Sequence, residues 1–196
     1  MSDQNYFQSF FQNNPELAAS ILKLSDISYL LPLMYTEIRM HAYQYGLENV
    51  LELGVRTGES TVALYSAVSE VNRDLKVKAE LNSVDIDPLC ESVVRNKLEN
   101  IKTTCDWKFH AKDSCELHWQ KPIDFLLIDS SHEEEQTLQE LNKYSPFLKL
   151  GGTIWLHDVR STIGVPNAIN KWRSKNKNWN YYETPTYAGL GWLKRK

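Results

Sequence analysis

The sequence has few cysteines and no long apolar run. Its three cysteines, Cys90, Cys105 and Cys115, are odd in number, and none forms a C-x-x-C pair with another. This excludes the paired spacing of a structural zinc site or a redox motif and fits free thiols in a reducing compartment. The N-terminus lacks a positive segment followed by an apolar one, and no run of about 18 apolar residues occurs, so we expect no signal peptide, no membrane partner and a cytoplasmic protein.

The sequence also lacks an excess of positive charge. Its 22 Lys and Arg residues against 25 Asp and Glu give a net charge of −3, which offers no overall attraction for a phosphate backbone. A basic cluster near the C-terminus has Trp172 and Trp179 nearby, so base stacking stays open, but a solvated helix end is the simpler interpretation. The cluster consists of Lys171, Arg173, Lys175, Lys177, Lys194, Arg195 and Lys196. We therefore expect no nucleic-acid partner.

The length and composition favour one globular domain. A chain of 196 residues that is 42% hydrophobic and 24% charged has enough apolar residues for a single core and is too short for two comfortable ones. We expect one domain over residues 1–196, with a helical extension over 1–46 and a cofactor-binding core over 47–196. The oligomeric state stays open, a homo-oligomer included.

The extension predicts two helices. The first has Pro15 in its first turn and apolar residues at helical spacing, namely Leu17, Ile21, Leu22 and Leu24. The second follows Asp26 or Ser28, has Pro32 in its first turn, and ends near Gly46, where a positive φ can close the helix.

From Asn49 onward, short apolar runs alternate with helical stretches. This alternation is typical of βαβ units and predicts an α/β fold with a doubly wound, mostly parallel, Rossmann-like sheet. The predicted strands cover 49–53, 78–85, 104–110, 125–129, 153–157, 179–184 and 190–194. The predicted helices cover 60–72, 89–100, 133–144 and 165–175.

A glycine-containing loop follows the first predicted strand. Gly54 and Gly58 remove the β-carbons that would keep a ligand off the backbone, and Ser60 or Thr61 can cap the next helix. Arg56 stands where a dinucleotide fingerprint requires its second glycine, which disfavours a pyrophosphate and with it a nucleotide-dependent oxidoreductase. S-adenosylmethionine has no pyrophosphate, and Glu52 offers a negative charge for its amino group.

Three successive strand ends resemble the class I S-adenosylmethionine-dependent methyltransferases. Glu52, Gly54 and Gly58 match the first motif of that family, and Asp85, at the end of the second strand, matches its ribose-binding acid. Asp113, after the third strand, matches its adenine-binding acid. Taken singly, Asp85 or Asp113 is better explained as a helix cap or a solvated loop residue. Their order along the chain favours the cofactor site.

The resemblance covers roughly residues 47–196 and implies a seven-stranded sheet with an antiparallel last strand. It implies S-adenosylmethionine as cofactor, held by residues of the loop and of the next three strand ends. The expected cofactor-binding residues are Glu52, Gly54, Arg56, Thr57, Gly58, Ser60, Asp85, Ile86, Asp113, Ser114 and Asp129.

The ends of the fourth and fifth strands carry candidate catalytic residues. The stretches 129–135 and 155–159 resemble the small-molecule O-methyltransferases related to catechol and macrocin O-methyltransferases. That resemblance implies a divalent cation such as Mg²⁺ at Asp129 and Asp158, with His157 as a third ligand, and His132 as the proton acceptor beside Asp129. The sequence has His157-Asp158 where the catechol type has Asp-Asn.

Simpler explanations stay open for two of these residues. The ring of His132 can cap nearby backbone, and Asp158 can cap the segment before Gly164. We expect the N-terminal helices and the loops 160–166 and 185–189 to select the acceptor. Five tyrosines in or near these segments can wall an aromatic or sugar acceptor, although packing in the core or an interface is the simpler interpretation for each. They are Tyr29, Tyr35, Tyr181, Tyr182 and Tyr187.

The sequence thus predicts an enzyme that methylates a hydroxyl of a small molecule or sugar, with a divalent cation as an optional aid. A metal-independent N- or C-methyltransferase and a non-catalytic cofactor-binding subunit are the alternatives.

Overall fold

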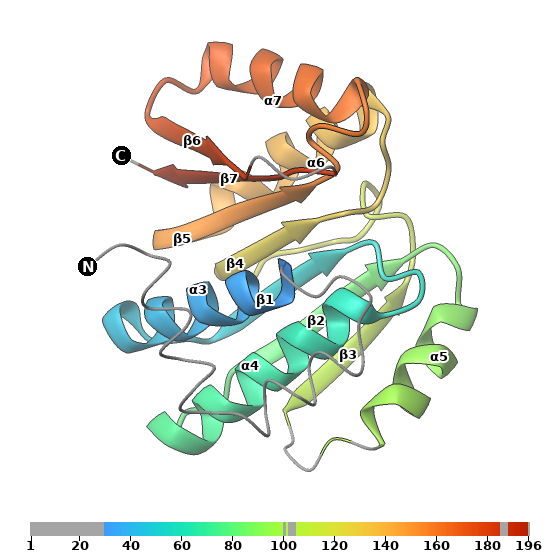
Figure 1. The fold of residues 1–196 in the computed structure, drawn as a ribbon, viewed down its shortest axis with the longest axis vertical. Helices are drawn as coiled ribbons and strands as arrows, with labels where there is room; N and C mark the ends of the chain where they lie inside the picture. Colours follow the sequence, from blue (N-terminus) through green and yellow to red (C-terminus); the bar gives the residue numbers. More distant parts are fainter. Residues whose placement is uncertain (1–29, 100, 102–104, 185–187, 196) are drawn as a thin grey trace.

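The computed structural model describes residues 30–99, 101, 105–184 and 188–195 (Figure 1). The first predicted helix, around Pro15 to Leu24, lies outside these residues. The second is α3 (Leu30–Tyr45), followed by Gly46 at φ 81°, whose N–H donates to the Ala42 carbonyl. The predicted helix end at Gly46 is therefore confirmed.

The remaining elements alternate as the sequence predicts, except that β3 is followed directly by β4 and β6 directly by β7. In chain order they are β1 (Asn49–Leu53), α4 (Glu59–Leu75), β2 (Glu80–Asp85), α5 (Leu89–Leu98), β3 (Asp106–Ala111), β4 (Ile123–Ile128), α6 (Glu134–Tyr144), the 3₁₀ turn η1 (Ser145–Phe147), β5 (Leu148–His157), α7 (Gly164–Lys175), β6 (Trp179–Glu183) and β7 (Leu190–Arg195).

The strands form one seven-stranded sheet in the order β3-β2-β1-β4-β5-β7-β6. β7 is antiparallel to both of its neighbours, and the other pairs are parallel, which confirms the predicted fold class. The chain runs outward from β1 through β2 to β3 and then returns to the other side of β1 with β4. Neighbouring β1 and β4 therefore mark the topological switch point, where open α/β sheets bind ligands.

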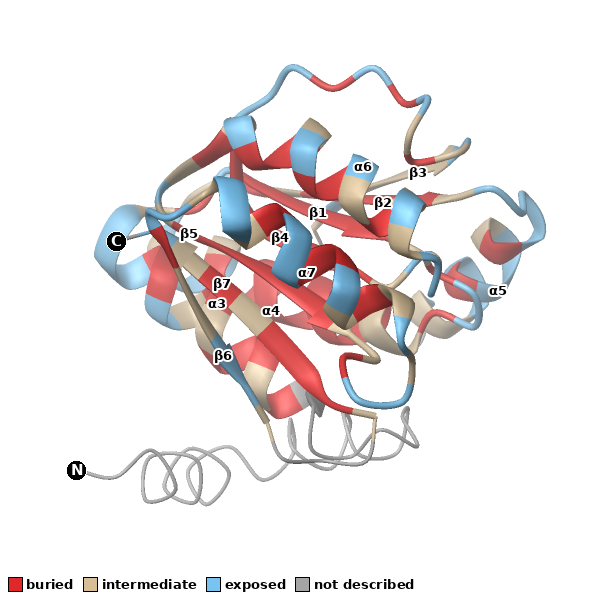
Figure 2. Cartoon of the chain, turned by 90° about the horizontal axis from the view of Figure 1, so that it is seen from above, coloured by how far each residue is buried: buried red, intermediate tan, exposed pale blue. Residues whose placement is uncertain are grey.

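Helices cover both faces of the sheet (Figures 1 and 2). Val50 and Phe125 point to the core beneath α3 and α4, whereas Leu51 and Leu126 point to the core beneath α6 and α7. β1 and β4 are buried along their whole length, as expected for central parallel strands whose successive side chains face opposite layers. No helix in the described ranges is long and apolar enough to cross a membrane.

β5 differs most from its prediction. It begins at Leu148, five residues before the predicted start, and includes Gly151 and Gly152. Gly151 has φ 79° and packs against the ring of Tyr45, and the pairing with β4 shifts register between Ile123 and Phe125. The glycines read locally as a turn, but pairing with β4 extends the strand through them.

Candidate active site

A polar cavity of about 390 Å³ opens at the carboxyl ends of β1, β2, β4 and β5. A second cavity of about 180 Å³, beside the end of β3, shares Gly54, Asp85 and Ser130 with the first. The residues lining the first are Gly54, Val55, Arg56, Thr57, Glu59, Ser60, Asp85, Asp87, Cys90, Asp129, Ser130, His132, His157 and Asp158. Most of the sequence-predicted site residues thus meet at the switch point.

The two glycines of the β1–α4 loop are required by neighbouring protein atoms. Gly54 has φ 89°, and a β-carbon there would lie 2.2 Å from the Asp129 carbonyl oxygen. Gly58 has φ 80°, and its β-carbon would lie 2.5 Å from a methyl carbon of Val94. The sequence predicted that both glycines let a ligand approach the backbone. The structure shows that they first let the end of β4 and helix α5 pack against the loop.

Asp85 fixes the shape of this loop. Its Oδ2 accepts hydrogen bonds from the N–H groups of Val55 (2.8 Å) and Arg56 (3.0 Å), and its Oδ1 accepts one from Asp87 (2.9 Å). Burial alone would raise the pKa of Asp85, but these backbone N–H groups outweigh it and hold the pKa below its usual value. Asp85 is therefore an ionised acceptor that lines both cavities.

Arg56 adopts an unusual backbone conformation. Its φ of 49° is rare for a residue other than glycine, and the hydrogen bond from its N–H to Asp85 holds it there. Arg56 and Thr57 both line the first cavity, as the sequence predicts for cofactor-binding residues.

Glu52 lies beneath the cavity and is not one of the residues lining it. It is fully buried and accepts hydrogen bonds from the hydroxyls of Ser60 (2.6 Å), Thr61 (2.7 Å) and Ser83 (2.7 Å). Burial raises the pKa of Glu52 to about 7, although the three hydroxyls lower it. The expected direct contact with the cofactor amino group is thus replaced by a supporting role, because the side chain points into the layer between β1 and α4.

The start of α4 also corrects a prediction. Neither Ser60 nor Thr61 caps the helix. Gly58 is the N-cap residue, and no side chain hydrogen-bonds to the first turn. Both hydroxyls are instead directed to Glu52.

The second cavity contains the predicted base-binding residues. Asp113, Ser114 and Ile86 line it together with Asp85. The Asp113 carboxylate accepts the Cys115 N–H at 2.7 Å, which shapes the turn after β3. Ile86 is 73% exposed, an unusual position for a large apolar side chain and one suited to contact a flat ring.

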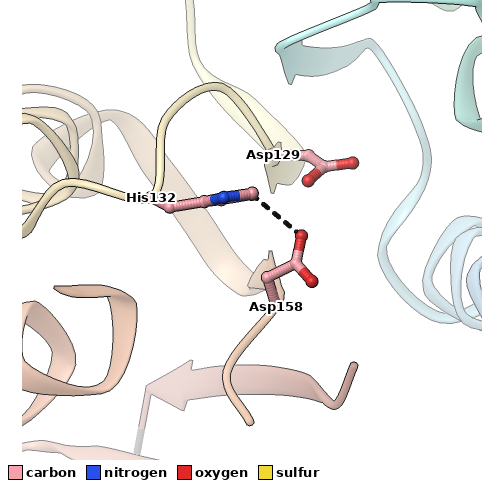
Figure 3. A group of neighbouring side chains, drawn as sticks. All are labelled: Asp129, His132 and Asp158. Carbon is pink, nitrogen blue, oxygen red and sulfur yellow. Dashed lines mark ion pairs between the residues drawn. The ribbon is translucent and has the colours of Figure 1, made fainter. Parts of the chain in front are cut away.

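Three side chains from the ends of β4 and β5 face one another in the first cavity (Figure 3). His132 Nε2 lies 2.9 Å from Asp158 Oδ2, and Asp129 lies next to these two side chains. Because an ionised carboxylate can only accept, the Nε2 proton of His132 is donated to Asp158, and Nδ1 of a neutral ring is left as an acceptor. The ring of His132 is 56% exposed.

Gly164 allows the loop after β4 to pack closely against the segment after β5. A β-carbon at Gly164 would lie 2.0 Å from the His132 carbonyl oxygen. Asp158 has φ 59°, a strained value for aspartate, and accepts a hydrogen bond from the Ser161 hydroxyl. Backbone strain of this kind often occurs at functional sites.

His157 lies within reach of both carboxylates that the sequence predicts as metal ligands. Its Nδ1 lies 3.0 Å from Asp158 and 3.3 Å from Asp129. Burial would lower the pKa of His157, but hydrogen bonds and charge from the two carboxylates outweigh it and raise the pKa to about 8.

The residues that fit a divalent cation are Asp129, His132 and Asp158. One ligand atom from each lies within 4.8 Å of the others. Two carboxylate oxygens and one imidazole nitrogen suit Mn²⁺, Fe²⁺ or Zn²⁺ and tolerate Mg²⁺. The structure therefore adds His132 to the candidate ligands Asp129, His157 and Asp158 that the sequence suggests.

The tyrosines considered for an acceptor wall lie elsewhere. Tyr29 and Tyr187 are outside the described residues. Tyr35 is fully buried and donates to Glu70, Tyr181 donates to Glu183, and Tyr182 stacks on Trp192. The three described tyrosines pack against the protein and do not line either cavity.

Sequence reasoning missed several residues that shape the site. Asp87, Glu59 and Cys90 line the first cavity, and Glu140 lies buried behind the second. Ser130, which belongs to the predicted stretch 129–135, lines both cavities. Glu140 gave no local signal, because a glutamate inside a helix is ordinarily a surface residue.

The fold and the two cavities define a class of protein: a doubly wound α/β domain with a polar, nucleoside-sized cleft at its switch point. The chain belongs to a family described as a methyltransferase domain, whose model matches residues 51–159, more than half of the sequence. No curated protein matches the sequence.

Solved methyltransferase structures share the fold. The O-methyltransferase TomG of tomaymycin synthesis from Streptomyces achromogenes, in complex with S-adenosylmethionine, is 12% identical with a TM-score of 0.65, and each chain is covered completely. An O-methyltransferase from Bacillus cereus bound to S-adenosylhomocysteine is 18% identical with a TM-score of 0.60, covering 96% of this chain and 91% of that one. A Podospora anserina methyltransferase bound to the same product is 15% identical with a TM-score of 0.58, covering 84% and 79%. The chain thus belongs to a methyltransferase family and shares its fold with methyltransferases that bind S-adenosylmethionine or S-adenosylhomocysteine.

Proposed function

We propose that this enzyme methylates a hydroxyl group of a small molecule, with His132 as the general base. The observation that carries the proposal is the His132–Asp158 pair on the wall of the first cavity. His132 Nε2 lies 2.9 Å from Asp158 Oδ2. Asp158 orients the ring, and the remaining nitrogen is free to take the proton of a hydroxyl nucleophile. O-methyltransferases among the structures with the same fold support the choice of oxygen.

The residues at the switch point fit the cofactor in both shape and charge. The second cavity takes the nucleoside end, with Asp85 as the acceptor for ribose hydroxyls and Asp113 beside the base. The first cavity, with Arg56, Thr57 and Ser60 on its wall, takes the methionyl end. S-adenosylmethionine supplies an electrophilic methyl group, and alignment of the acceptor with that methyl is the main task of the protein.

A divalent cation is the second element of the proposal. Asp129 and Asp158 would hold it, and it would lower the pKa of a bound acceptor hydroxyl. His132 is close enough to be a third ligand, so the ring has two candidate roles. One is the removal of a proton and the other is coordination of the metal.

The test combines turnover with metal binding. Replacing His132 by Gln should lower kcat by about 10²- to 10⁴-fold, the usual contribution of a general base, with the dissociation constant of S-adenosylhomocysteine unchanged within about twofold. Panels of phenolic, sugar and aliphatic hydroxyl acceptors provide the assay, with methyl transfer followed by mass spectrometry. Methylation of nitrogen or carbon acceptors alone would overturn the assignment to oxygen.

Calorimetric titration with Mn²⁺ separates the two roles of His132. A ligand role predicts weaker Mn²⁺ binding in H132Q, whereas a role limited to proton transfer predicts unchanged binding. D158N should weaken Mn²⁺ binding in either case. Full activity after chelation with EDTA would overturn the metal part of the proposal and leave the base in place.

A further inference from the structure

Glu140 is a buried glutamate of α6 that ties together two strand ends of the active site. Its side chain is inaccessible to solvent. Its Oε1 accepts hydrogen bonds from the hydroxyls of Ser114, after β3, and Ser130, after β4, both at 2.5 Å. Both serines line the second cavity, whereas Glu140 does not.

This arrangement fixes the polarity of the Ser114 hydroxyl. A hydroxyl has one proton, and that of Ser114 is donated to Glu140, so its oxygen can only accept from other groups. The neighbouring contacts hold the serine in place. Gln136 Nε2 approaches Ser114 Oγ at 3.5 Å, and the Tyr144 hydroxyl donates to the Ser114 carbonyl.

Two neighbouring groups at the base end of the cavity therefore present acceptors. Asp113 contributes a carboxylate, and Ser114 beside it is an acceptor because of Glu140. An adenine ring carries an amino group at position 6 and donates to such a site. A 6-oxo purine presents a carbonyl at the same position and leaves these acceptors facing another acceptor, which loses a hydrogen bond that adenine makes.

We propose that Glu140 is a positioning residue that holds the Ser114 hydroxyl as an acceptor and thereby makes the cofactor site selective for a 6-amino purine over a 6-oxo purine. The inference rests on the assignment of S-adenosylmethionine as cofactor. It adds a residue outside the cavity as a determinant of base recognition. Glu140 acts through Ser114 and does not itself contact the cofactor.

The experiment compares two ligands by calorimetry: S-adenosylhomocysteine and its 6-oxo analogue S-inosylhomocysteine. Wild type should bind the adenosyl compound at least about tenfold more tightly. Glu140→Met should lower this ratio by about fivefold or more, because the freed Ser114 hydroxyl can turn and donate to a 6-oxo group. Glu140→Gln should retain the ratio within about twofold, because an amide oxygen can accept from both serines.

Glu135→Met is the matched control, since it makes the same change at an exposed position of the same helix. It should leave the ratio unchanged. A purely structural role of Glu140 would weaken both ligands alike, so an unchanged ratio in a folded E140M variant overturns the inference. If E140M does not fold, Ser114→Ala takes its place, and an unchanged ratio in that variant overturns it equally.

The cofactor assignment fails in a different way. If wild type binds neither ligand, the proposed function and this inference fall together. If wild type binds the adenosyl compound and folded E140M keeps the wild-type ratio, only the inference is overturned.

Discussion

Asp85 serves the fold and the site with the same carboxylate. It accepts backbone N–H groups from Val55 and Arg56 and also lines both parts of the cofactor cleft. The sequence identified this residue from its place at the end of β2. The hydrogen bonds to the loop after β1 depend on β1 and β2 lying side by side, which only the sheet provides.

Replacing Asp85 by Ala should weaken binding of S-adenosylhomocysteine by about 10- to 100-fold. Loss of one charge-assisted acceptor costs about 1.5–3 kcal/mol, and 1.4 kcal/mol is a factor of ten in affinity. Calorimetric titration measures the effect. Asp106→Ala, at a carboxylate on β3 that pairs with Lys108 away from the cleft, should bind normally, and equal affinity in both variants would count against the assigned site.

At the scale of the element, the loop between β1 and α4 depends on close packing against β4. Gly54 and Gly46 have similar backbone angles, with φ 89° and 81°, but different surroundings. A β-carbon at Gly54 would meet the Asp129 backbone at 2.2 Å, whereas one at Gly46 would meet nothing within 4 Å. Substitutions at Gly46 and Gly54 therefore distinguish the cost of backbone strain from the cost of a steric clash.

Gly46→Ala should lower the free energy of unfolding by about 1–2 kcal/mol, the ordinary cost of a left-handed residue. Gly54→Ala should lower it by a further amount of about 1–3 kcal/mol, because the end of β4 must move, and should also impair cofactor binding. Urea denaturation and calorimetry measure the two effects. Equal losses of stability in the two variants would show that the close approach of Asp129 is not what excludes a side chain.

At the scale of the whole molecule, the buried Glu52 should make stability depend on pH. The pKa of Glu52 is about 7 in the folded protein against an ordinary value of 4.5. Between these values the folded state binds more protons than the unfolded state, so the free energy of unfolding should fall as pH rises from about 4.5 to about 7. The loss is at most on the order of 3 kcal/mol, at 1.36 kcal/mol per pKa unit.

Glu52→Gln should remove this decline, so the variant should gain stability relative to wild type between pH 5 and pH 8. Urea unfolding at both pH values measures the difference. Glu80→Gln is the control, because Lys108 and Lys121 lower the pKa of Glu80 to about 2 and the carboxylate is ionised in both states throughout this range. A difference between wild type and E52Q that is the same at both pH values would contradict the raised pKa.

The sequence by itself determined the alternation of strands and helices, since period-2 and period-3.6 patterns are local properties of the chain. It also placed Asp85, Asp113, Asp129 and Asp158 at strand ends, and parallel strands bring such ends to one edge. The sequence did not predict the start of β5 correctly, because Gly151 and Gly152 join the strand only through pairing with β4.

Only the tertiary structure decided which side chains line the two cavities and which contact one another. Glu52 turns inward to three hydroxyls, His132 lies beside the two aspartates together with His157, and Glu140 reaches two turns that are distant in sequence. These outcomes depend on distances between separate elements. A residue's type and its neighbours along the chain do not contain that information, because packing between layers sets the direction of each side chain.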